Sequence, residues 1–82
     1  MDKLRAMRVF ASVAHEGSLA DAGRMLDLTP TAVSRQLAEL EADLGARLVN
    51  RTTRSLALTE VGQRFLESVQ HILRCVEEGE AL

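Results

Sequence analysis

Three polar side chains near the middle of the chain have the types and the spacing to contact nucleic acid. Thr31, Ser34 and Arg35 lie within four residues of one another, which places them near one face of a helix. Arginine can bind the O6 and N7 atoms of guanine, and small polar side chains allow a close approach to base edges. This pattern favours a helix that presents a DNA-contacting face, although an ordinary amphipathic surface helix would show a similar one.

The other residues that could carry chemistry lack partners at the required spacing. His15 and His71 are far apart, with no Cys or carboxylate at ligand spacing, which argues against a metal site. Ser34 has neither a nearby base nor a G-x-S-x-G setting, so it is not a nucleophile. Cys75 is interpreted as a small interface residue rather than a redox sensor. We therefore expect no enzymatic activity, no metal and no cofactor.

The helix that carries this polar face has clear start and stop signals. Thr29 is a good N-cap, and Pro30 suits the first helical position because its φ is already helical. Gly45 is expected to end the helix. Its apolar residues recur with the helical period and predict one buried stripe: Val33, Leu37, Leu40 and Leu44.

A shorter helix before it is predicted to complete a helix-turn-helix over residues 18–37. Ser18 and Asp21 form an S-x-x-D capping box at its start. Its expected buried residues are Leu19, Ala22, Met25 and Leu26. Gly23 is expected where another backbone approaches, since glycine costs about 1 kcal/mol in a helix interior. The helix start at Ser18 could donate amides to a DNA phosphate, but a plain capping role fits at least equally well.

A first helix and a short hairpin frame this unit. The first helix is predicted to end at Gly17 and to bury one side, made of Leu4, Met7, Phe10, Ala11 and Ala14. Leu48-Val49 and Leu56–Leu58 are predicted strands, with residues 50–55 as the tip of a wing that spans about 47–58. The predicted fold is therefore mainly α, a winged helix-turn-helix of three helices and a two-stranded wing in residues 1–58, followed by a long helix.

The last helix, residues 59–82, is predicted to serve both its own domain and a partner chain. Thr59 caps it, and a coiled-coil-like seam with an adjacent leucine follows: Phe65, Val69, Ile72, Leu73 and Val76. Its first half, to about Val69, can close the core of its own domain. Because so small a domain is not expected to cover Ile72, Leu73 and Val76, the seam predicts a homodimer.

These ordered features resemble the N-terminal DNA-binding domain of LysR-type transcriptional regulators of bacteria. The matching residues are Phe10, the run G-S-L-A-x-A at 17–22, Leu26, P-T-A-V-S-R-Q-L at 30–37, L-E-x-x-L-G-x-x-L at 40–48, Arg51 and L-T-x-x-G at 58–62. Val49 and Gly23 depart from the family pattern at packing positions. The resemblance implies that Pro30, Thr31, Ser34 and Arg35 face the major groove, that the wing arginines Arg51 and Arg54 lie on the backbone or minor groove, and that the last helix dimerises.

Charge and composition narrow the class of partner. The formal net charge is −2, but arginines concentrate between residues 44 and 64 and glutamates follow them. A basic patch this small favours dimerisation for affinity. Two Phe and no Trp or Tyr argue against single-stranded nucleic acid or RNA, which is generally held by aromatic stacking. A winged helix used for protein–protein contact is the alternative, but its outward face should carry large apolar anchors. We therefore expect double-stranded DNA.

The remaining expectations concern the cellular setting. The sequence shows neither a membrane span nor a signal peptide, and its single Cys fits the bacterial cytoplasm. LysR-type regulators continue beyond the last helix into an effector-binding domain. We therefore expect a fragment or isolated domain, whose small-molecule effector would bind only through a C-terminal domain absent from this chain.

Overall fold

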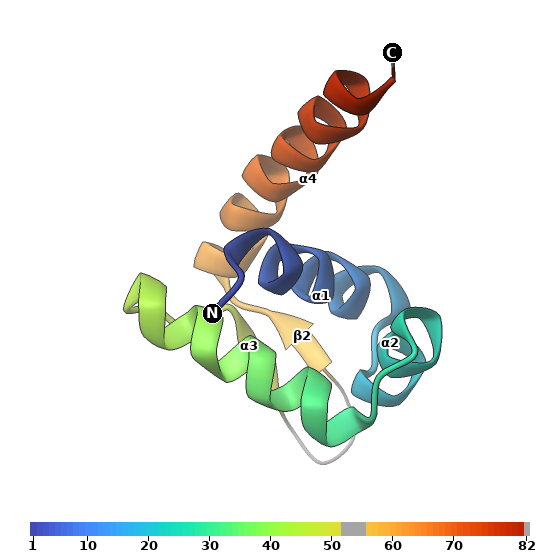
Figure 1. The fold of residues 1–82 in the computed structure, drawn as a ribbon. Coiled ribbons are helices and arrows are strands. Elements are labelled where there is room, and N and C mark those ends of the chain that lie inside the picture. The colour runs from blue at the N-terminus through green and yellow to red at the C-terminus, as the bar shows by residue number, and fades with distance from the viewer. Residues whose placement is uncertain (52–55, 82) are drawn as a thin grey trace.

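Four helices and two strands make up the described part of the chain, residues 1–51 and 56–81 of a computed structural model (Figure 1). In chain order they are α1 Lys3–Glu16, α2 Leu19–Leu26, α3 Pro30–Leu44, β1 Val49–Arg51, β2 Leu56–Leu58 and α4 Glu60–Glu80. The first three helices pack on one another, the two strands form a hairpin, and α4 packs on α1. The predicted fold class, a mainly helical winged helix-turn-helix with a long last helix, is confirmed.

The helix ends are fixed by local hydrogen bonds. At each N-cap a side-chain oxygen accepts from the amide three residues on: Asp2 from Arg5, Ser18 from Asp21, Thr29 from Ala32 and Thr59 from Gly62. Gly17 and Gly45 end α1 and α3 in the left-handed region, with φ of 78° and 69°, where glycine carries no steric cost. The caps predicted at Ser18, Thr29, Thr59 and the two glycines are confirmed.

The capping box of α2 is only half formed. The Asp21 amide donates to Ser18 Oγ at 3.0 Å, as expected. The Asp21 carboxylate, however, pairs with the Arg24 guanidinium one turn along the helix instead of returning to the Ser18 amide. The prediction of a reciprocal box was wrong because a cation at i+3 attracts the carboxylate more strongly than a neutral amide.

One hydrophobic core joins α1, α2, α3, the wing and α4. Its fully or nearly fully buried residues are Ala6, Met7, Val9, Phe10, Val13, Ala22, Val33, Leu37, Leu40, Leu48, Val49 and Val69. Phe10 of α1 meets Phe65 of α4 with ring centroids 5.7 Å apart and planes tilted by 37°, a favourable aromatic geometry. The two aromatic side chains thereby anchor the long helix to the three-helix unit.

Three apolar residues predicted to be buried are exposed. Met25 is 69% exposed because Leu19, Ala22, Gly23 and Leu26 lie together on the inner side of α2, and Met25 falls outside that arc. Leu4 is 41% exposed because it lies opposite Val13 on the helical wheel of α1. Leu44 is 39% exposed although it continues the stripe of α3, because it is the last residue of that helix.

The wing strand begins one residue later than predicted. β1 pairs antiparallel with β2, with Val49 opposite Leu58 and Arg51 opposite Leu56. Asn50 and Arg51 therefore belong to the strand rather than to the tip, while Leu48 precedes it. The rest of the expected tip, including Arg54, lies outside the described residues.

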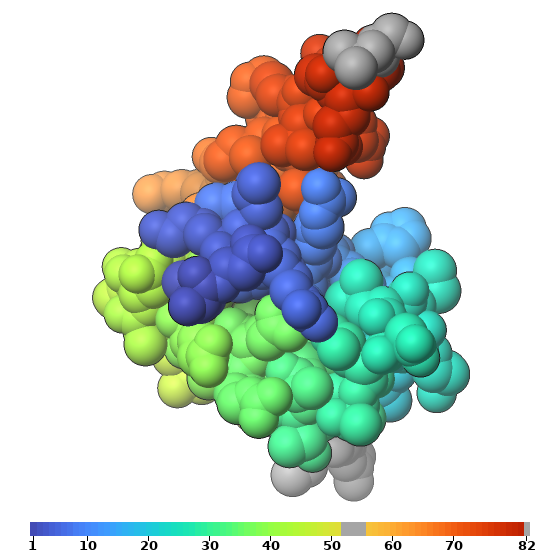
Figure 2. Space-filling view, viewed as in Figure 1, coloured from blue at the N-terminus to red at the C-terminus, as the bar shows by residue number. Residues whose placement is uncertain are grey.

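The α4 helix starts against the wing and ends away from the rest of the molecule (Figures 1 and 2). At Gly62 a Cβ atom would overlap the carbonyl oxygen of Leu48, so only glycine allows this approach. Val69 is completely buried in the single chain and has no surface left for a partner, which corrects its assignment to a dimer seam. Ile72 and Leu73, expected to lie uncovered, are half-buried against the core.

No helix in the described ranges combines the length and the apolar character that crossing a membrane requires.

Candidate nucleic-acid interface

The outward face of α3 near its N-terminus is polar and open to solvent. Pro30, Thr31 and Arg35 are exposed, and Ser34 is half-buried. These four residues line one shallow hollow together with Leu19 of α2 and Ala38. The structure thus brings together the four α3 residues that the sequence predicted to face DNA. Ser18 directly precedes Leu19 in the chain, and its hydroxyl caps α2 by accepting from the Asp21 amide.

Arg35 supplies this face with its positive charge. Among residues 1–51 and 56–81, its guanidinium has no carboxylate within ion-pair distance. Other arginines do have such partners: Arg24 pairs with Asp21, and Arg64 with Glu60. Arg35 can therefore reach a ligand without first giving up an ion pair within this part of the chain.

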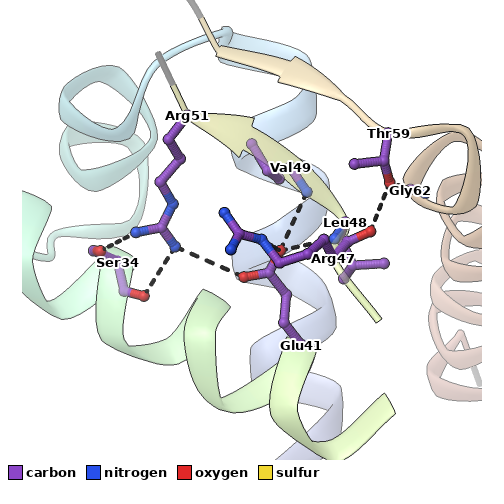
Figure 3. Close-up of polar contacts among 8 residues, drawn as sticks. All are labelled: Ser34, Glu41, Arg47, Leu48, Val49, Arg51, Thr59 and Gly62. Carbon is purple, nitrogen blue, oxygen red and sulfur yellow. Dashed lines mark hydrogen bonds and ion pairs between the residues drawn. The ribbon is translucent and has the colours of Figure 1, made fainter. Parts of the chain in front are cut away.

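Arg51, predicted to contact DNA from the wing, contacts α3 in the free domain (Figure 3). Its Nη1 atom donates to Ser34 Oγ at 2.6 Å, and its Nη2 atom donates to the Ser34 carbonyl at 3.4 Å. The Arg51 side chain keeps 32% of its surface exposed. Two of the predicted site residues thus touch each other across the junction of helix and wing.

Glu41 organises this junction, a role that its place in the family pattern at residues 40–48 did not predict. Its Oε2 atom accepts from the amides of Leu48 at 2.7 Å and Val49 at 3.2 Å (Figure 3). Its carboxylate also lies 3.8 Å from Arg47 Nε and 4.0 Å from Arg51 Nη2, with a side chain only 11% exposed. Glu41 therefore holds the start of the wing against α3. The available signal was a glutamate beside the apolar stripe, which is an unusual place for an unpaired charge.

Thr59 ties the other end of the wing to α4. Its hydroxyl donates to the Arg47 carbonyl at 2.6 Å while accepting from the Gly62 amide, and its own amide donates to the Leu48 carbonyl at 2.9 Å. The N-cap role was predicted, but the bond to Arg47 was not, because it depends on how the chain folds back. Together Glu41 and Thr59 fix the segment between α3 and β1 from both sides.

Residues 1–51 and 56–81 hold no group of three or more His, Cys, Asp or Glu side chains able to bind one ion. Cys75 Sγ and His71 Nε2 lie 3.8 Å apart on the exposed side of α4. A pair of potential ligands falls short of the four-coordinate sites typical of zinc.

The family model of the bacterial regulatory helix-turn-helix proteins of the lysR family matches residues 4–63, which include the whole of this interface. The chain belongs to that family. An HTH-type transcriptional repressor of Pseudomonas aeruginosa (strain UCBPP-PA14) is 43% identical over 81 residues, 99% of this chain and 26% of the relative. The transcriptional activator AaeR of Escherichia coli (strain K12) is 36% identical over 78 residues, 95% of this chain and 25% of the relative. The chain thus spans about a quarter of the length of these curated relatives.

Solved structures of the family agree with the fold in detail. The DNA-binding domain of CbnR in complex with DNA has a TM-score of 0.90 and 35% identity, covering 96% of this chain and 90% of that one. The BenM DNA-binding domain with benA site 1 DNA has a TM-score of 0.89 and 32% identity, covering 95% and 86%. The chain is therefore a DNA-binding domain of the lysR family.

Proposed function

We propose that this lysR-family domain binds an operator as a homodimer, with the N-terminal half of α3 from each copy in a major groove. Pro30, Thr31, Ser34 and Arg35 would face the bases. The observation that carries the proposal is the open polar face of α3, where Arg35 projects without an ion-pair partner among the described residues. The complexes of the CbnR and BenM domains with DNA support the same use of this fold.

The wing and the start of α2 would supply contacts with the DNA backbone. We assign Arg54 to the phosphates or the minor groove from its place in the sequence, since positive side chains at a wing contact the backbone without reading bases. Arg51 would contribute charge close to the same groove while bonded to Ser34. At Ser18 the free amides of the first turn of α2 would contact a phosphate, since the hydroxyl is already engaged.

Dimerisation would use the part of α4 that extends past the core. Phe65, Ile72 and Leu73 are half-buried against the core of their own chain, and Val76 is half-buried farther along the helix. Their remaining apolar surface would pack on the same residues of a second copy. Val69 would support this face from within the core rather than touch the partner.

Membership of the lysR family supports a wider assembly around this domain. We infer that the domain acts within a longer regulator in the bacterial cytoplasm, whose small-molecule effector binds a separate C-terminal domain. The relatives include both a repressor and an activator. The domain would supply operator recognition in either case, and the remainder of the protein would set the direction of regulation.

The experiment that tests this proposal compares duplexes with one and two half-sites. Two recognition helices related by twofold symmetry require an inverted repeat with centres one or more DNA turns apart. We expect the affinity for the two-half-site duplex to exceed the value calculated for two half-sites that bind independently. Equal affinity per half-site at every spacing would refute the dimer, and absence of any sequence preference would refute operator recognition.

A further inference from the structure

The hydroxyl of Ser34 has only part of its hydrogen-bonding capacity left. A serine hydroxyl has one proton to donate and two lone pairs, whereas a guanidinium has five donors and accepts nothing. Arg51 Nη1 donates to Ser34 Oγ at 2.6 Å, so one lone pair of the hydroxyl is occupied. The Ser34 proton stays available for another group.

The protein offers no acceptor for that proton within residues 1–51 and 56–81. In this part of the chain the hydrogen bonds of Ser34 to other side chains are those it accepts from Arg51, at Oγ and at its carbonyl. Ser34 lies on the rim of the hollow lined by Thr31 and Arg35, on the face proposed to enter the major groove. A ligand in that hollow would therefore meet a hydroxyl whose proton is not committed to these residues.

The guanidinium also changes which atoms can approach. A positive charge 2.6 Å from Oγ attracts negative atoms and repels the positive hydrogen of a second donor. Accepting a bond from a cation also polarises the O–H group, which makes it a stronger donor. The remaining lone pair is consequently a poor acceptor for the amino groups of adenine or cytosine.

Glu41 keeps this arrangement in place before DNA binds. Its carboxylate lies 4.0 Å from Arg51 Nη2 and also accepts from two amides at the start of the wing. Glu41 and Ser34 both lie on α3, so both groups that contact the Arg51 guanidinium come from one helix. That helix therefore fixes the position of the Arg51 side chain.

We propose that Arg51 is a positioning residue that makes Ser34 a hydrogen-bond donor toward DNA, so that Ser34 selects an acceptor atom. The acceptor is N7 or O6 of guanine, N7 of adenine or O4 of thymine in the major groove, or else a phosphate oxygen. This inference rests on the proposed placement of α3 in the major groove.

The test removes single acceptor atoms from the duplex. Duplexes selected by the wild-type chain are resynthesised with 7-deazapurines to remove N7, 2-aminopurine to remove O6 of guanine, 5-methyl-2-pyrimidinone to remove O4 of thymine, or one methylphosphonate to neutralise a phosphate. Dissociation constants are measured for wild type, Ser34→Ala, Arg51→Met and Arg51→Lys. Arg64→Met, which removes an exposed α4 arginine paired with Glu60, is the charge-matched control.

A modification at the base contacted by Arg35 should weaken wild type and Ser34→Ala alike. One further modification should weaken wild type about 3- to 10-fold, the range of a single hydrogen bond. The same modification should leave the affinity of Ser34→Ala unchanged. It should weaken binding by Arg51→Met less than binding by wild type. It should weaken binding by Arg51→Lys and Arg64→Met by nearly the same factor as binding by wild type. A sensitive base locates the acceptor in the groove, and a sensitive phosphate locates it on the backbone.

Two results would overturn the inference. Wild type and Ser34→Ala could respond alike to every modification, or Arg51→Met could keep the full penalty. If wild type selected no duplex at all, the operator-binding proposal would fail together with the inference. That outcome is distinguishable because it precedes every comparison between variants.

Discussion

Glu41 Oε2 accepts a hydrogen bond from the Leu48 amide at 2.7 Å, across the turn that leads from α3 into the wing. Through this bond, and the one from Val49, the helix proposed to contact bases and the strand beside it share one carboxylate. The side chain is nearly buried, so its charge is offset by amides and arginines rather than by water. The wing is therefore already fixed relative to α3 before any DNA is bound.

Replacing Glu41 should loosen this junction. Glu41→Gln keeps the shape of the side chain but removes the charge that strengthens both amide bonds, so we expect the free energy of unfolding to fall by about 1–3 kcal/mol. Urea denaturation measures the loss, and hydrogen exchange should show faster exchange at the amides of Leu48 and Val49. Glu39→Gln, an exposed position on the same helix, is the matched control. Equal stability and equal amide protection in the two variants would contradict the role given to Glu41.

Gly62 should tolerate no side chain. A Cβ atom there would overlap the backbone oxygen of Leu48, which is fixed because it also accepts from the Thr59 amide. We expect Gly62→Ala to cost about 1–3 kcal/mol, as overpacking does. For a domain of this size each kcal/mol lowers Tm by roughly 4–8 °C.

Gly79→Ala is the control for that substitution. Gly79 lies on the same helix, and an added methyl group there would meet open space, so alanine should be neutral or stabilising by up to about 1 kcal/mol. Thermal unfolding of both variants by circular dichroism decides the matter. A Gly62→Ala variant as stable as Gly79→Ala would show that α4 does not approach the wing this closely.

The sequence predicted most of what depends on neighbouring residues. The caps at Ser18 and Thr29 were predictable because donor and acceptor lie three residues apart. The exposed position of Met25 was missed because Gly23 takes part in the buried face of α2, and glycine contributes nothing to an apolar pattern.

The site was predictable residue by residue but not as an arrangement. Thr31, Ser34 and Arg35 share a face because helical periodicity requires it. The bond between Ser34 and Arg51 joins residues 17 positions apart, and that between Glu41 and Leu48 crosses a turn. Such contacts depend on the direction in which the wing returns to α3, which no local pattern specifies.

The dimer seam on α4 should be sensitive to charge at Val76. Val76 is half-buried and lies beyond Ile72 and Leu73, which pack on the core, so an aspartate there should disturb association more than folding. Burying a side chain of this size is worth roughly 1.5–3 kcal/mol in each copy. We expect Val76→Asp to be folded and monomeric by light scattering, with weaker binding to a two-half-site duplex.

Gln70→Asp, which places the same charge at an exposed position of α4, is its control and should remain dimeric. A Val76→Asp variant that associates as strongly as Gln70→Asp would place the seam on a different surface. A variant that unfolds would instead assign Val76 to the stability of its own chain.

The sequence preference of Arg35→Ala decides whether α3 reads the bases of DNA. Arg35 projects from the open face of α3, so its loss should cost about 1–3 kcal/mol on the selected site and relax the preference at one position of each half-site. Selection of binding sites from random duplexes, followed by titration of the selected and scrambled duplexes with both proteins, measures the two effects together. Loss on the selected duplex alone, with relaxed preference at that one position, is the predicted result. Equal loss on selected and scrambled duplexes would contradict the claim that this face of α3 reads DNA sequence.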